Sequence, residues 1–226
     1  LFYRHHKFFG IGFICVIGLT AIIWTQSFVF IYTRLHPRVS ASMWIYKNIP
    51  PGSTIGNEHW DDPQPLYNTG GNPGDYKGME LTLYYPDSDA NKWKQMADKL
   101  EKTDYIAITS NRLWRSLSAI PFKYPQTARY YKALFDGTLG FEQVAVFSSH
   151  PCLLPKNQID QTQPETTNLH PRPISFIITN YCYLALNDDG AEESFTVYDH
   201  PKVIIFKKTP KFSTAKLFNI VNGTND

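Results

Sequence analysis

The sequence predicts an α/β protein. One N-terminal transmembrane helix precedes a three-layer-like α/β domain with a mostly parallel sheet and a C-terminal edge hairpin. Three observations predict this fold: residues 8–32 are apolar, residues 53–148 alternate between strand-like and helix-like patterns, and two strand-like segments flank a turn at 199–202. The predicted parts are a short cytoplasmic flank at 1–7, a transmembrane helix at 8–33 and an extracytoplasmic α/β domain at 34–226, with an insertion expected at 149–190.

The apolar run at 8–32 predicts a helix that spans a membrane. It is about 25 residues long and carries no charge, and a helix of that length crosses a bilayer core of roughly 30 Å. A buried helix of a soluble protein and a cleaved signal peptide are the alternatives. The first rarely stays apolar on all sides for so long, and the second has a shorter apolar core.

The charges that flank this run are almost balanced. Arg4 and Lys7 precede it, and Arg34 and Arg38 follow it. The two histidines before it, His5 and His6, slightly favour a cytoplasmic N-terminal side by the positive-inside rule. We therefore expect a cell-membrane protein whose C-terminal domain is extracytoplasmic. Because the chain begins at Leu1 and not at Met, we also expect it to be the tail of a longer polypeptide with earlier spans.

The composition excludes one class of protein and leaves one pairing open. The chain has 226 residues and a formal net charge of +2, whereas nucleic-acid binders normally carry a clustered basic face. Of its three cysteines, Cys15 lies in the predicted span. Cys152 and Cys182 are a candidate disulfide in an oxidising compartment, and ordinary buried thiols in the cytosol.

The residues after the span predict their elements in order. Residues 37–49 have helical spacing, and Pro50-Pro51-Gly52 ends the helix because prolines and glycine stop it. The next elements expected are a strand at 53–57, a loop at 58–78, a strand at 79–84, a helix through Leu100, a strand at 104–109, a helix at 125–136 and a strand at 141–148. This alternation is the pattern of crossover units around a mostly parallel sheet.

The last third of the chain departs from that alternation. Residues 149–173 are rich in proline, glutamine and threonine, and we expect an exposed insertion there. Strand-like residues 194–198 and 203–206 flank Asp199-His200-Pro201-Lys202, which predicts a hairpin turn rather than a catalytic pair. A last helix is expected at 213–221.

Several runs, in their order along the chain, resemble the C-terminal part of bacterial multi-spanning glycosyltransferases of the GT-C fold, similar to the dolichyl-phosphate-mannose protein mannosyltransferase family. The runs are Ala41 to Ser53, Glu58 to Asp62, Asp104 to Ile106, Ser110 to Leu113 and Glu193 to Val203. The resemblance covers most of residues 37–207, and the block at 149–190 departs from it.

The resemblance implies a membrane enzyme that moves a sugar from a polyprenyl-phosphate carrier to a glycan or protein acceptor outside the cytoplasm. Family members place their catalytic carboxylate in an external loop upstream of this region, so no catalytic residue is assigned here and the fragment alone is expected to be inactive. The implied partners are the lipid bilayer, the sugar donor and the acceptor, with no nucleic acid. The first alternative is a non-catalytic, membrane-tethered domain that binds carbohydrate or another envelope component, and a third is a purely structural module.

The densest group of candidate ligand-binding residues follows the first predicted strand. It consists of Glu58, His59, Trp60, Asp61 and Asp62. Carboxylates and an imidazole suit several divalent metals, so a metal is a candidate cofactor of unknown identity, and an indole face can stack on a sugar ring. The alternative is a strand-end turn in which the aspartates bond local amides.

Two further motifs have competing interpretations. Asn111 and Arg112 follow the strand at 104–109, where open α/β sheets place ligands, and Arg112 suits either a phosphate or a structural ion pair. Asp87-Ser88-Asp89 resembles the Asp-X-Asp of nucleotide-sugar transferases, but its place before a helix favours a helix cap.

Overall fold

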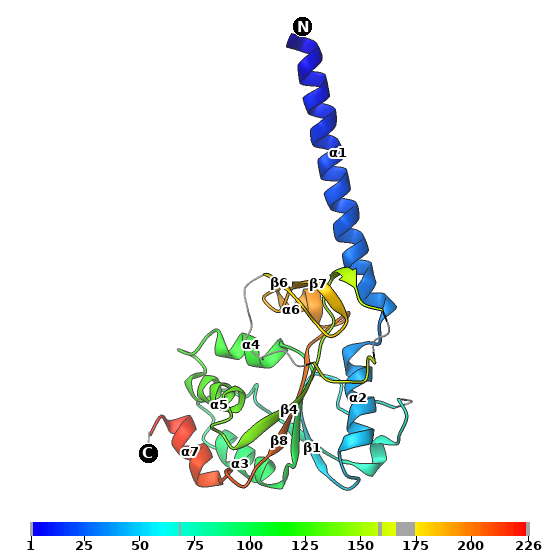
Figure 1. The fold of residues 1–226 in the computed structure, drawn as a ribbon. Coiled ribbons are helices and arrows are strands. Elements are labelled where there is room, and N and C mark those ends of the chain that lie inside the picture. The colour runs from blue at the N-terminus through cyan, green and yellow to red at the C-terminus, as the bar shows by residue number, and fades with distance from the viewer. Residues whose placement is uncertain (1, 68, 158–159, 166–174, 225–226) are drawn as a thin grey trace.

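The computed structural model describes residues 2–67, 69–157, 160–165 and 175–224 (Figure 1). Its first helix, α1 (Phe2–Val29), projects from the rest of the chain, which it contacts only near its C-terminal end, and continues into a short 3-10 helix, η1 (Phe30–Thr33). The side chains of residues 8–26 are exposed, and the helix is long and apolar enough to cross a membrane. A long apolar helix at this place in the chain is confirmed, while its passage through a membrane and its orientation stay predictions.

A five-stranded mixed sheet forms the centre of the domain. Its strands, in the order β2-β1-β3-β8-β4, are β2 (Lys77–Leu81), β1 (Thr54–Glu58), β3 (Tyr105–Ile108), β8 (Val203–Lys208) and β4 (Phe141–Phe147). The strand β1 is parallel to β2 and β3, whereas β8 is antiparallel to β3 and β4. The prediction of a mostly parallel sheet is therefore wrong, although α/β is the correct class.

The predicted C-terminal edge hairpin is also wrong. Its second strand, β8, lies between β3 and β4 and not at an edge, and Val203 to Phe206 are almost fully buried. Such a continuous apolar run is typical of an interior strand, which is covered on both faces. Its expected partner contains a short helix instead, α6 (Glu193–Thr196), whose start is capped by Glu192 as it accepts from the Ser194 amide.

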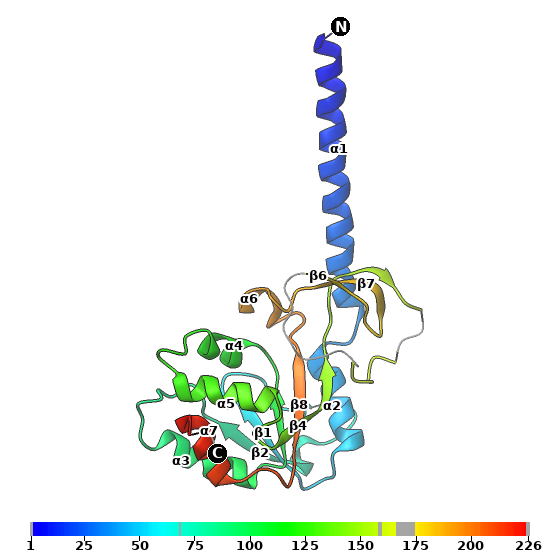
Figure 2. The same cartoon turned by 60° about the vertical axis from the view of Figure 1, so that its left-hand side comes forward.

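Helices cover both faces of this sheet (Figures 1 and 2). On one face α2 (Pro37–Asn48) buries Ala41 and Ile45 against β1, β3, β4 and β8. On the other lie α3 (Lys92–Lys102), α4 (Arg112–Ser118), α5 (Pro125–Phe135) and α7 (Thr214–Asn222). Each large apolar side chain that this packing buries contributes about 1.5–3 kcal/mol, so the two helical layers hold the sheet rigidly between them.

Asp87 joins two of these helices in a way that the sequence did not predict. Its carboxylate accepts hydrogen bonds from the Gln126 and Thr127 amides at the start of α5, at 2.7 and 3.0 Å, and pairs with buried Lys92 at 2.7 Å. The expected cap on the following helix is wrong in this respect, because α3 begins after Asn91 without a side-chain cap. Asp87 is a structural residue of the α3–α5 junction.

A second, three-stranded antiparallel sheet lies between the large sheet and α1 (Figure 1). Its strands, in the order β5-β7-β6, are β5 (Cys152–Pro155), β7 (Cys182–Asn187) and β6 (Ser175–Ile177). Cys152 and Cys182 form a disulfide that joins β5 to β7. This sheet falls within the expected insertion at 149–190, of which residues 158–159 and 166–174 lie outside the described part of the chain.

Candidate functional site

An open cleft of about 310 Å³ lies at the carboxyl ends of β1 and β2. Ligands of open α/β sheets bind at this end of the strands, because the connecting loops diverge there. Four of the five residues in the predicted group at 58–62 line it. The described lining residues are Asn57, Glu58, His59, Trp60, Asp61, Pro63, Gly78, Met79 and Glu80.

Glu58 ends β1 and forms the buried floor of this cleft. One carboxyl oxygen accepts a hydrogen bond from the Tyr131 hydroxyl at 2.7 Å, while Oε2 is buried and has no hydrogen-bond partner among the described residues. Burial raises the pKa of Glu58 to about 8, and the nearby Asp61 charge adds to this effect. At neutral pH the group is therefore a neutral carboxylic acid, which has a proton to donate to a ligand oxygen.

Aromatic rings line up beside the cleft. The ring centroid of Trp60 lies 4.6 Å from that of Tyr84, which in turn lies 4.5 Å from His59 and 4.6 Å from Tyr85. The His59 ring also contacts the Glu80 carboxylate. Trp60 is 59% exposed although its ring is large and apolar, so one face of the indole is available to a ligand.

The backbone of Trp60 is strained. Its φ is +71°, a left-handed conformation that costs a residue with a Cβ about 1–2 kcal/mol. Strain of this kind persists where the surrounding structure holds it, and it is common at binding sites. Here it holds the indole at the mouth of the cleft while its own carbonyl accepts from Arg112 at 2.8 Å.

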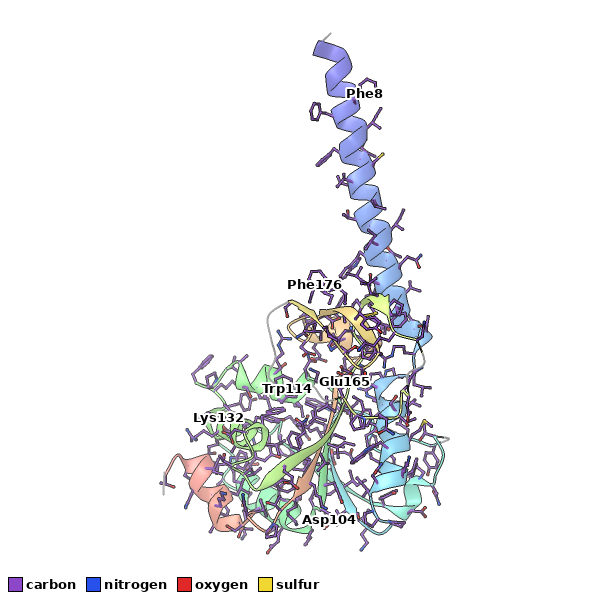
Figure 3. All side chains as sticks on the ribbon, viewed as in Figure 1. Phe8, Asp104, Trp114, Lys132, Glu165 and Phe176 are labelled. Atoms are coloured by element: carbon purple, nitrogen blue, oxygen red, sulfur yellow. A yellow bond between two sulfur atoms is a disulfide. The ribbon has the colours of Figure 1, made fainter. Side chains whose placement is uncertain are left out.

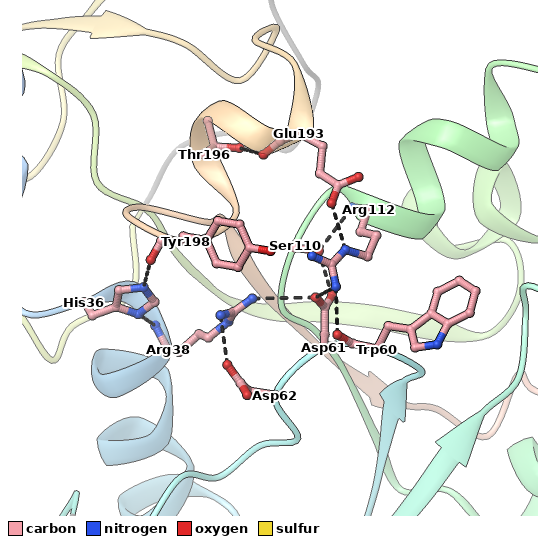
Figure 4. Close-up of polar contacts among 10 residues, drawn as sticks. All are labelled: His36, Arg38, Trp60, Asp61, Asp62, Ser110, Arg112, Glu193, Thr196 and Tyr198. Atoms are coloured by element: carbon pink, nitrogen blue, oxygen red, sulfur yellow. Dashed lines mark hydrogen bonds and ion pairs between the residues drawn. The ribbon is translucent and has the colours of Figure 1, made fainter.

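The two aspartates of the group are fixed by buried arginine and serine side chains (Figure 4). Asp61 accepts from the Ser110 hydroxyl at 2.6 Å, and its other oxygen lies 3.6 Å from Arg38 and 3.8 Å from Arg112. Asp62 pairs with Arg38 at 3.0 Å and does not line the cleft. The structure thus brings Asp61 to the site and leaves Asp62 as a surface ion pair.

Arg112 is held away from the cleft interior. Its Nε donates to Glu193 at 2.7 Å, a bond that raises the pKa of the guanidinium above its ordinary value. Trp60 and Asp61 are its other partners. Arg112 is therefore part of a structural ion pair, which was one of its two interpretations from the sequence. Asn111 does not line the cleft, and it lines a separate cavity together with Ile204 of β8 and Ser148, the residue after β4.

That separate cavity contains a polar chain that the sequence analysis missed. Ser148, at the end of β4, lies 3.0 Å from His150 Nε2, and His150 Nδ1 lies 2.8 Å from Asp188. The second oxygen of Asp188 lies 2.8 Å from His200 Nε2. All four residues are buried. We name this set the Ser148–His200 chain.

Serine, histidine and aspartate follow one another in this way in nucleophilic hydrolases, where the serine donates its proton to the histidine. Here the hydrogen bond between serine and histidine has the opposite direction. Ser148 donates its hydroxyl proton to Glu165 at 2.6 Å, so His150 must donate to Ser148 and to Asp188. Burial would lower the pKa of His150, yet the Asp188 bond and nearby carboxylates raise it overall. Burial likewise opposes ionisation of Asp188, but bonds from His150 and His200 lower its pKa to about 2.

The cavity beside this chain has a volume of about 30 Å³, about a tenth of the 310 Å³ of the open cleft. It has no room for a substrate, and we interpret the Ser148–His200 chain as a brace that joins the two sheets. In the sequence, only Ser148-Ser149-His150 directly after a strand hinted at it, since Asp188 is distant. Among the described residues, no group of three or more His, Cys, Asp or Glu is arranged to hold a metal ion.

The two groups of residues singled out by sequence therefore separate in space. Glu58, His59, Trp60 and Asp61 meet in the cleft, Asp62 and Arg112 surround it, and Asn111 lies elsewhere. The result is a polar cleft with aromatic side chains, on an α/β domain whose chain also contains a helix that is long and apolar enough to span a membrane. No protein family, no curated protein and no solved structure matches this chain.

Proposed function

We propose that this chain is the C-terminal membrane anchor and extracytoplasmic domain of a glycosyltransferase that uses a polyprenyl-phosphate-linked sugar. The catalytic part is upstream of residue 1, as the family resemblance implies. Within this assembly the cleft of Glu58, His59, Trp60 and Asp61 holds the neutral sugar portion of the acceptor or donor. The α1 helix keeps that cleft close to the bilayer in which the lipid carrier resides.

The composition of the cleft is the observation that carries this proposal. An exposed indole beside hydrogen-bonding side chains is suited to a ligand with apolar ring faces and many hydroxyls. None of the described residues that line the cleft is lysine or arginine, and Asp61 and Glu80 are acidic. The described lining therefore offers a phosphate no lysine or arginine side chain to pair with, so the cleft favours an uncharged sugar over the phosphate of the carrier.

Sugar binding can be measured on the full chain in detergent micelles, with methyl α-mannopyranoside as the probe and saturation-transfer NMR as the readout. We expect Trp60→Ala to weaken binding about tenfold, a loss of about 1.4 kcal/mol that matches one ring-stacking contact. Phe122→Ala removes an aromatic side chain outside the cleft that is even more exposed than Trp60, so it is the control.

Mannose 6-phosphate provides the charged version of the same ring. It should bind more weakly than the methyl glycoside, because the cleft lining is acidic. Binding of the neutral probe that is equal in wild type and Trp60→Ala would remove the cleft from the proposal. Preferential binding of the phosphate would instead assign the site to the lipid carrier's head group.

The transferase and the non-catalytic binding domain differ in what surrounds this cleft. An immunoblot of source-cell membranes, with an antibody against residues 34–226, gives the size of the native polypeptide. A mass far above that of this chain supports the transferase, and substitution of Glu58, His59, Asp61 and Asp62 in that polypeptide should then reduce transfer. A band at the mass of this chain supports a stand-alone, membrane-tethered carbohydrate-binding domain.

A further inference from the structure

The small sheet has apolar side chains on both of its faces. Cross-strand partners share a face, so Cys152, Ile177 and Ala185 point to one side, where they pack with Tyr181. The pairs Phe176–Leu186 and Leu154–Leu184 share the other side. An antiparallel sheet that faces water normally carries polar residues on its outer side, and this one does not.

The described side chains on that outer side are largely exposed. Phe176 is 63% exposed and Leu154 is 55% exposed, and Ile178, just after β6, is 69% exposed. We define these three residues with Leu184 and Leu186 as the β5–β7 outer face. Contiguous apolar surface of this kind marks a contact with another apolar phase.

The β5–β7 outer face is continuous with the base of α1. Strand β5 packs against α1, and Figure 3 shows Phe176 on the side of the domain from which α1 emerges. Around the same base lie further exposed aromatic residues. They are Tyr32, Phe195 and Tyr198, and the Phe195 ring is 5.5 Å from Phe28 of α1. Aromatic side chains around the end of a membrane-spanning helix are typical of the boundary between lipid and water.

We propose that the β5–β7 outer face lies on the surface of the bilayer that α1 crosses, with Leu154, Phe176 and Ile178 inserted among the lipid acyl chains and head groups. The occupant is lipid because the face begins where the membrane-spanning helix leaves the domain, at the depth of the head groups. Asp199, which follows α6, lies beside Tyr32 at the base of α1, while Lys156 lies over the Tyr183 ring. Because charged side chains of both signs lie there, the contact with the bilayer is made by insertion of apolar side chains and not by attraction to anionic lipids. This inference requires α1 to span the bilayer, and it is independent of the proposed sugar binding.

Fluorescence quenching in vesicles tests this contact with the full chain. In a Cys15→Ser background, an environment-sensitive fluorophore is attached to Phe176→Cys, and the protein is reconstituted in phosphatidylcholine vesicles that contain nitroxide-labelled phosphatidylcholine. Phe122→Cys, on the α4–α5 connection, is the matched exposed aromatic site, and Ile22→Cys in α1 is the lipid-embedded reference. Peptide mapping without reductant verifies that Cys152 and Cys182 remain paired in each variant.

We expect the label at 176 to be quenched by the lipid nitroxide several-fold more strongly than the label at 122, and to be shielded from aqueous iodide. Quenching at 176 no stronger than at 122 would overturn the proposal. A blue-shifted label at 176 that neither quencher reaches would also overturn it, because the face would then be covered by protein. An unquenched label at 22 would show that α1 does not insert, which removes the premise.

Discussion

Two polar sites in this domain contain similar chemical groups and differ in how those groups are satisfied. The cleft at the ends of β1 and β2 is open, and the buried Oε2 of Glu58 has no hydrogen-bond partner among the described residues. The Ser148–His200 chain is enclosed, and each of its members bonds to the next, although His200 Nδ1 at its end has no hydrogen-bond partner among the described residues. An unsatisfied buried oxygen beside an open cleft suggests a ligand, whereas side chains that bond to one another beside a small cavity suggest a brace.

The largest effect should come from breaking the brace. Asp188→Asn removes the charge that two histidines surround, and loss of one partner from a buried ionic cluster costs about 3–5 kcal/mol. Urea denaturation of the full chain in micelles gives the free energy of unfolding. Asp62→Asn, at a 65%-exposed carboxylate, is the control and should change it by less than about 1 kcal/mol.

The pH dependence of that loss follows from the two pKa shifts. The pKa of Asp188 is lowered, so its contribution is present above about pH 4 and disappears as the pH falls through about 2. The pKa of His150 is raised, so its contribution is complete below about pH 6.5 and disappears as the pH rises through the higher native value. A difference between wild type and Asp188→Asn that stays constant from acid to neutral pH would contradict an ionised brace.

The disulfide should have the next largest effect, and it acts on the same region. Replacing both Cys152 and Cys182 by serine releases a loop of 30 residues, which costs about 3–4 kcal/mol through the unfolded state. Cys15→Ser, in α1, should leave the free energy of unfolding unchanged because that thiol is free and exposed. Equal stability of the double variant and the wild type under oxidising conditions would rule out a stabilising bridge.

Glu58 in the cleft should make the domain less stable as the pH rises, which is the opposite of the effect of Asp188. Glu58 has a raised pKa, so the folded state keeps its proton while the unfolded state loses it above about pH 4.5, and stability falls until about pH 8. Glu58→Gln keeps an acceptor for Tyr131 and removes this penalty, about 3 kcal/mol at neutral pH, since each pKa unit is worth about 1.4 kcal/mol. Unfolding at about pH 5 and about pH 8 measures it. Parallel pH profiles for the two proteins would mean that Glu58 is ionised in the fold.

The smallest stability change distinguishes strain from contact at Trp60. Trp60→Gly and Trp60→Ala both remove the indole, but only glycine relaxes the left-handed backbone, so the glycine variant should be about 1 kcal/mol more stable than the alanine variant. Both should lose sugar affinity equally. A glycine variant that is less stable than the alanine variant would show that the backbone conformation is not strained.

The sequence predicted the local elements better than their pairing. The apolar span, the helix at 37–49 and the buried strand at 104–109 each have a pattern within one short segment, and the structure contains all three. The direction and position of β8 depend on which neighbours leave an unpaired edge, and no segment alone carries that information.

The polar sites show the same difference between residues within one segment and residues that distant segments bring together. Glu58 to Asp61 are adjacent, so the sequence alone shows a dense group of candidate ligand-binding residues there. The Ser148–His200 chain joins residues from three separate segments, and His200 alone was interpreted as part of a turn. The Asp87 cap was assigned to the nearest helix because its true partner, α5, begins far along the chain.

The position of β8 also decides when the domain can form during synthesis. Strands β3 and β4 precede β8 in the chain, and each pairs with it in the sheet. Until residues 203–208 have left the ribosome, β3 and β4 are not joined in the sheet, and the edges at which they pair with β8 keep unpaired backbone groups open to solvent or chaperones. Nascent chains arrested before Val203 should therefore be degraded readily by added protease, and chains arrested well beyond Lys208 should resist it.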